Sequence, residues 1–145
     1  MNKKLALLTM SMIASAGLAR AADVDSILLR QTVMDLQGGT LSGITAVANA
    51  KGDIKKLEGA AKGLQRSGTF IPALFPKGTE TGQNTKAKAE IWSDPAGFQK
   101  ASDTFDAAAT KLVSAVQTGE ADNVLTAAKG VEDSCVACHR SFRAR

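Results

Sequence analysis

The 145-residue chain is poor in the residues from which most enzyme and metal sites are built. It contains one His, two Cys and no Tyr, and its aromatic residues are five Phe and one Trp. A zinc site with four Cys or His ligands is excluded, because only three such residues are present. A Ser-His-Asp site would depend on that same histidine, His139. Strand patterns are also lacking, since β-branched residues never alternate with polar ones over a useful length.

The first 21 residues have the features of a secretory signal peptide. Two lysines give a positive start, Leu5 to Leu18 is mostly apolar, and Ala19-Arg20-Ala21 matches the A-x-A cleavage pattern. The apolar run is too short to span a membrane. We therefore expect export to the periplasm, cleavage after Ala21, and a mature domain of residues 22–145 without a membrane span.

Removal of this segment changes both the net charge and the methionine count. The whole chain has 18 Lys and Arg residues against 14 Asp and Glu residues, but three of the positive charges lie in the signal segment. The mature chain then has 15 against 14, a net charge of +1. Nucleic-acid binding is not expected, because no basic stripe with interleaved aromatic residues remains. Met34 is the only methionine left.

Four segments of the mature chain have the apolar spacing of amphipathic helices. They run from about Val24 to Ala48, from Ile54 to Arg66, from Pro95 to just before Gly119, and from about Asp122 through Phe142. Asp53 and Asp94 stand at the expected N-caps of the second and third helices. A long loop, Gly68 to Ser93, separates these two helices. The pattern predicts an all-α fold, an antiparallel four-helix bundle.

Cys135-Val136-Ala137-Cys138-His139 is a C-x-x-C-H motif, the pattern of c-type haem attachment. Two thiols three residues apart can each form a thioether with one vinyl group of a single porphyrin, and His139 then supplies an axial ligand to the iron. A disulfide inside a continuous helix has poor geometry, and a thioredoxin-like pair would follow a strand at a helix N-terminus. We therefore expect one covalently bound haem c, held by Cys135, Cys138 and His139.

The second axial position of such a haem has two alternatives. Ligation by two histidines is excluded, so Met34 either binds the iron or packs beside it in the core. Arg30, one turn before Met34, needs a partner if it faces inward, and a haem propionate would supply one. The alternative is a surface arginine with a partly covered stem. Arg143 either approaches the proximal side of the haem or interacts with the C-terminal end of the helix dipole.

The sequence resembles the class II c-type cytochromes, the family of cytochrome c′ and cytochrome c-556. The resemblance covers the mature chain and implies a left-handed antiparallel bundle with one haem, in a monomer or homodimer, with periplasmic redox partners. It also implies that Arg30 matches the propionate-binding arginine and Met34 the distal position. Ala89 departs from the proline that many members have there. The matching segments are Arg30 to Met34, Leu74 to Thr79, Lys88 to Trp92, and the C-x-x-C-H motif followed by Arg143.

The two branches of this family imply different functions, which depend on Met34. In cytochrome c-556 a methionine of the first helix binds the iron, and on this pattern we expect a one-electron carrier with His139 and Met34 as ligands. The alternative is a five-coordinate, high-spin cytochrome c′ that binds NO or CO, with Met34 packing over an open iron site. An enzymatic role is not expected, because no general acid or base remains once His139 binds the iron.

Overall fold

The computed structural model describes the backbone of residues 14–145 and the side chains from Ser26 onward. The first 13 residues of the predicted signal peptide lie outside the described residues, so cleavage after Ala21 stays a prediction. Within the described part of the chain, no helix combines the length and the apolar character needed to cross a bilayer.

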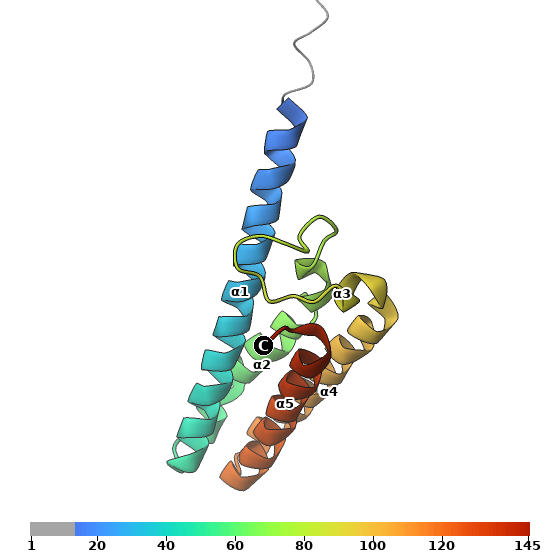
Figure 1. The fold of residues 1–145 in the computed structure, drawn as a ribbon. Coiled ribbons are helices and arrows are strands. Elements are labelled where there is room, and N and C mark those ends of the chain that lie inside the picture. The colour runs from blue at the N-terminus through green and yellow to red at the C-terminus, as the bar shows by residue number, and fades with distance from the viewer. Residues whose placement is uncertain (1–13) are drawn as a thin grey trace, which may run out of the picture.

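Four long helices form an antiparallel bundle, as the sequence predicts (Figure 1). Their directions alternate along the chain, because each helix returns beside the one before it. Short turns join the first pair and the last pair at the same end of the bundle, and the long loop lies at the opposite end. The four helices are α1 (Ala14–Asn49), α2 (Glu58–Gly68), α4 (Pro95–Thr118) and α5 (Ala121–Phe142).

The ends of the third predicted helix are confirmed. The Asp94 side chain accepts a hydrogen bond from the backbone N–H of Gly97 at 2.9 Å, and Pro95 occupies the first turn of α4. A side chain at position 97 would collide with the Asp94 carboxylate, so glycine permits this cap. At the other end Gly119 has φ 80°, a left-handed conformation that ends the helix at little cost.

Asp53 stands at an N-cap position, as predicted, but its side chain does not act as a cap. Asp53 precedes a 3₁₀ helix, η1 (Ile54–Leu57), that leads into α2, and its side chain makes no capping hydrogen bond. The carboxylate instead forms an exposed ion pair with Lys56 at 3.1 Å.

The predicted long loop contains two short helical segments, η2 (Ile71–Leu74) and α3 (Glu90–Ser93). Each spans about one turn, too short to show a helical period in the sequence. Each nevertheless buries an isoleucine, Ile71 in η2 and Ile91 in α3. The loop is therefore attached to the bundle at both of its ends.

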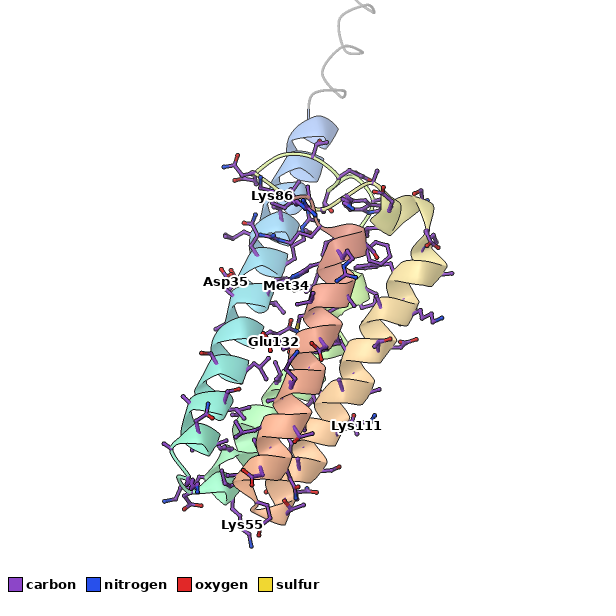
Figure 2. The ribbon with its side chains drawn as sticks, turned by 60° about the horizontal axis from the view of Figure 1, so that its bottom comes forward. Met34, Asp35, Lys55, Lys86, Lys111 and Glu132 are labelled. Carbon is purple, nitrogen blue, oxygen red and sulfur yellow. The ribbon has the colours of Figure 1, made fainter. Side chains whose placement is uncertain are left out.

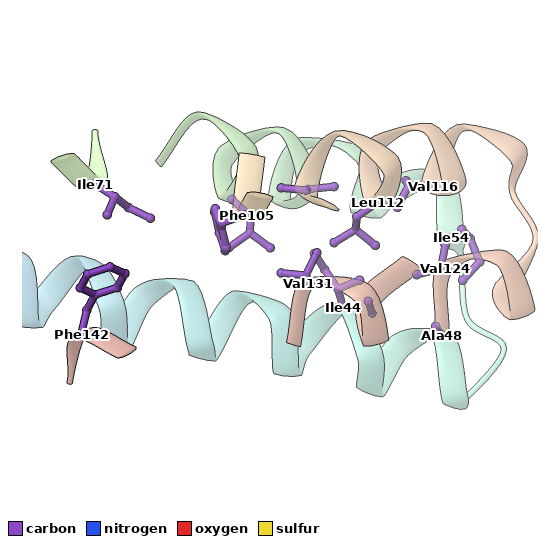
Figure 3. Packing of buried hydrophobic residues seen from close by; sticks show 14 of the residues in the cluster. Ile44, Ala48, Ile54, Ile71, Phe105, Leu112, Val116, Val124, Val131 and Phe142 are labelled. Carbon is purple, nitrogen blue, oxygen red and sulfur yellow. The ribbon is translucent and has the colours of Figure 1, made fainter. Parts of the chain in front are cut away.

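One continuous core runs along the bundle axis (Figure 3). Leu112, Val116, Val124 and Val131 have no exposed surface, and they fill the space between α4, α5 and the facing helices. Gly38 and Gly39 neither interrupt α1 nor allow a close approach by the chain, because a Cβ at either position would meet no atom within 4 Å.

Candidate functional site

The C-x-x-C-H motif lies in the last two turns of α5. Cys135 and Cys138 are half-buried, unpaired with each other, and packed against the hydrophobic core. His139 is exposed. The two thiols therefore lie one turn apart toward the inside of the bundle, while the histidine lies at the edge of the same face.

Burial shifts the pKa of all three titratable groups of the motif. It raises the pKa of both thiols, which keeps Cys135 and Cys138 protonated at neutral pH. Partial burial, followed by the positive charge of Arg143, lowers the pKa of His139. The neutral imidazole is therefore favoured, and this is the form whose nitrogen lone pair can bind a metal ion.

Arg30 is buried, with 3% of its surface exposed, so its alternative interpretation as a surface arginine is wrong. Its Nη1 donates to Thr79 Oγ1 at 2.8 Å. Its Nη2 donates to the Thr79 carbonyl at 2.7 Å and to Thr85 Oγ1 at 2.7 Å. The guanidinium also lies 4.8 Å from the ring centroid of Phe75, a cation–π distance.

These contacts leave Arg30 with part of its hydrogen-bonding capacity. A guanidinium has five N–H groups, and the three bonds to the loop use three of them. Burial lowers the pKa of Arg30, and the nearby carboxylate of Glu80 raises it in part. The sequence prediction that Arg30 needs a partner is confirmed, but the partners seen are oxygen atoms of the loop.

A chain of aromatic side chains surrounds the same end of the bundle. Phe75 packs edge-to-face with Trp92 at 6.2 Å and with Phe98 at 5.0 Å, and Phe98 packs in the same way with Phe142 at 5.2 Å. The Trp92 indole N–H donates to the Phe75 carbonyl at 3.0 Å. Residues of the loop, α3, α4 and α5 thus form one apolar wall beside the motif.

Met34 lies on α1, on the side that faces α5 (Figure 2). It is partly buried and packs against the core cluster, to which Cys135 and Cys138 also belong. This arrangement brings the predicted distal residue and the two cysteines to facing helices. It is compatible both with an iron ligand and with an apolar cover.

The chain end after α5 is held by the long loop, a contact that sequence reasoning did not identify. Ala87 and Arg143 form an antiparallel β-bridge, and the Lys88 ammonium donates to the carbonyls of Arg140 at 3.2 Å and Ser141 at 3.1 Å. Lys88 therefore satisfies carbonyl groups that the end of α5 leaves free. Arg143 is exposed and follows the last residue of the helix.

A cleft of about 440 Å³ opens between α4 and α5 beside the motif. Cys138 forms part of its wall, together with Ala101 of α4 and Phe142. Of the motif, only Ala137 and Cys138 line the cleft, and Met34 and Arg30 do not.

The residues present are suited to holding a haem c. Both cysteines are unpaired, half-buried and free to form thioethers, and neutral His139 stands next to the second of them. The aromatic wall is apolar, as a porphyrin face requires, and Arg30 brings a buried positive charge to the same end. The propionates of a haem are negatively charged, and one of them would pair with Arg30.

Comparison with known proteins identifies the family. A family model described as Cytochrome C′ matches residues 25–143. The cytochrome c′ of Rubrivivax gelatinosus is 33% identical over 122 residues, covering 82% of this chain and 94% of that protein. Its crystal structure matches with a TM-score of 0.75 and 31% identity, over 83% of this chain and 96% of that one.

Two further structures come from Alcaligenes xylosoxidans. Both are cytochrome c′ variants, one in complex with nitric oxide and one with carbon monoxide bound. Each matches with a TM-score of 0.76 and 29% identity, over 85% of this chain and 97% of that one. The matching family model, the relatives and the shared bundle agree with the motif: the chain belongs to the cytochrome c′ family and binds a covalently attached haem c.

Proposed function

We propose that this chain is an exported, periplasmic haem protein whose iron has an open distal side that binds NO or CO. The observation that carries the proposal is the match to cytochrome c′ structures in complex with nitric oxide and carbon monoxide over nearly their whole length. When bound, haem c supplies an iron that changes oxidation state by one electron and accepts a small ligand.

The chain's own residues have distinct roles in this proposal. Cys135 and Cys138 hold the haem covalently, and His139 is the proximal ligand. Packing of the two cysteines against the core limits the positions that the thioethers can take. The lowered pKa of His139 favours the neutral imidazole, which is the form that binds the iron.

Arg30 is proposed to serve both the loop and the haem. Its two remaining N–H groups can donate to a propionate while the other three hold Thr79 and Thr85. Arg143, whose charge already affects the pKa of His139, is proposed to lie on the proximal side. We propose no catalytic turnover, since the single histidine is committed to the iron.

Met34 is proposed to cover the open side of the iron as an apolar side chain. The second candidate function, one-electron transfer with Met34 as the distal ligand, is favoured by one observation. Met34 is the only methionine of the predicted mature chain, and it lies on the face of α1 that is turned toward α5. The two functions differ in whether the methionine sulfur binds the iron.

The optical spectrum of the ferric protein, with a Met34→Ala variant, tests this choice. The proposal predicts a high-spin spectrum that Met34→Ala leaves unchanged, and ready CO binding by the ferrous form. Leu41→Ala, another partly buried residue of α1, is the control for loss of packing. A low-spin ferric protein with a red sulfur-to-iron charge-transfer band, converted to high spin by Met34→Ala, would contradict the open site and favour Met ligation.

A further inference from the structure

We infer that the surface around the exposed part of the C-x-x-C-H motif is the docking site for the acidic face of a one-electron donor protein. The inference rests on the proposed function, since CO binds only ferrous iron and ferric iron must gain one electron before it can bind CO. We call this surface the basic end and define it as residues 76–90 together with residues 136–145.

Tertiary structure brings the two parts of the basic end together. The backbone N–H of Ala144 donates to the Lys86 carbonyl at 2.7 Å, and that of Lys88 donates to the Phe142 carbonyl at 3.0 Å. The bridge between Ala87 and Arg143 lies between these two bonds. Residues more than fifty positions apart are thereby held side by side at the C-terminal end of α5, which carries the C-x-x-C-H motif.

The charge of the basic end is strongly one-sided. It contains six cationic and two acidic side chains, whereas the predicted mature chain has a net charge of only +1. Lys86, Arg140, Arg143 and Arg145 are exposed. The cationic residues are Lys77, Lys86, Lys88, Arg140, Arg143 and Arg145, and the acidic ones are Glu80 and Glu90.

The carboxylates nearest to this surface along α5 are compensated only in part. Glu132 and Asp133, one turn before Val136, both pair with Lys129, Glu132 at 4.0 Å. Together with Lys129 they leave one net negative charge, which is smaller than the excess of four positive charges on the basic end. Such a patch steers an oppositely charged partner toward it during diffusion.

One exposed apolar side chain lies within the charged surface. Val136, inside the motif itself, is 51% exposed, and His139 and Arg140 follow it on the same side of α5 at three and four positions. A small apolar centre with a charged rim is the anatomy of a transient protein–protein interface. Val136 is the only large apolar side chain exposed on the basic end, too little for insertion into a membrane.

The electron transfer itself requires no chemistry from the protein at this surface. The donor loses one electron, the ferric iron gains it and becomes ferrous, and no proton or covalent bond changes. The basic end brings the donor to the helix that carries the haem attachment residues. This function needs charge at particular positions rather than a particular total charge.

Two double variants of the haem-loaded mature protein test the inference with equal net charge. Lys86→Gln with Arg140→Gln removes two charges from the basic end. Lys55→Gln with Lys111→Gln removes two exposed charges elsewhere on the bundle (Figure 2). The ferrous proteins are mixed with ferricyanide, an anionic redox probe, over a range of ionic strength, and binding of polyglutamate is measured separately by calorimetry.

We expect ferricyanide to react with the wild type at a rate that falls as salt is added. At low salt the Lys86/Arg140 variant reacts roughly threefold or more slowly and binds polyglutamate more weakly by a similar factor. The Lys55/Lys111 variant keeps the wild-type rate and affinity. Far-ultraviolet circular dichroism and the haem spectrum of each variant show that fold and haem attachment are intact.

Equal losses of ferricyanide rate and polyglutamate affinity in the two double variants would overturn the inference. The net charge of the protein, and not the location of the charges, would then determine both. Binding to vesicles of phosphatidylglycerol without binding to polyglutamate would also overturn it, in favour of a membrane surface. Failure of the proposed function is a separate result. A protein that binds no CO or NO but retains the difference between the variants refutes the gas-binding proposal alone.

Discussion

At the scale of single residues, Arg30 shows how a buried charge can organise a site. Its guanidinium is in contact with an aromatic ring and donates to three oxygen atoms of one loop. Thr79 is fully buried, and its hydroxyl in turn donates a hydrogen bond to the Pro76 carbonyl at 2.8 Å. The loop therefore keeps its conformation because Arg30 of α1 donates hydrogen bonds to its polar groups.

Replacing Arg30 with Gln should destabilise the protein by roughly 2–4 kcal/mol, because buried acceptors lose charged donors. Thr85→Val removes a single acceptor and should cost less. Urea unfolding of the haem-loaded protein measures both free energies. Equal stabilities for the wild type and Arg30→Gln would mean that the loop does not depend on this side chain.

At the scale of elements, each helix end is determined by a few local contacts. Two aspartates at predicted N-caps behave differently, because Asp94 accepts from a backbone N–H and Asp53 pairs with a lysine. At the C-terminal end of α5, the Lys88 ammonium of the loop donates to the free carbonyls of Arg140 and Ser141. The start of α4 is thus determined by neighbouring residues in the sequence, whereas the end of α5 depends on contacts with the loop.

The two aspartates form a matched pair for measurement. Asp94→Ala should lower the free energy of unfolding by about 1 kcal/mol, the usual contribution of an N-cap. Asp53→Ala should have a smaller effect, because it removes only an exposed ion pair. Thermal or urea unfolding compares the variants, and a larger loss for Asp53→Ala would contradict the capping assignment.

At the scale of the whole molecule, the two ends of the bundle have different compositions. Aliphatic side chains such as Val116 and Val124 fill the end with the short turns, and Phe142 lies at the other end (Figure 3). An aromatic chain from Trp92 to Phe142 surrounds that other end. The attachment motif, Arg30 and the basic end all share that second end.

Changing both cysteines of the motif to alanine should abolish covalent haem attachment. The denatured mature chain should then lose its haem peroxidase stain, and its mass should fall by that of one haem beyond the two substitutions. Val136→Ala, inside the same motif, is the control that keeps both thiols. Covalent haem in the double variant would show that Cys135 and Cys138 are not its attachment points.

Much of the site could be predicted from the sequence because its chemistry is local. Cys135, Cys138 and His139 lie within one pentapeptide on one helix, and the helical period alone places both thiols on the apolar stripe. The helix boundaries at Pro95 and Gly119 were predictable for the same reason. The 3₁₀ start of the second helix and the one-turn α3 were not, because single turns carry no period.

The sequence by itself determined the four helices, the family and the residues suited to holding a haem, since these depend on spacing over a few turns. Only the tertiary structure decided which groups satisfy Arg30, because Thr79 and Thr85 lie about fifty positions away and the path of the loop joins them. It also decided that Lys86 and Lys88 lie beside the chain end. Long-range pairing depends on how the helices pack, and a local pattern does not contain that information.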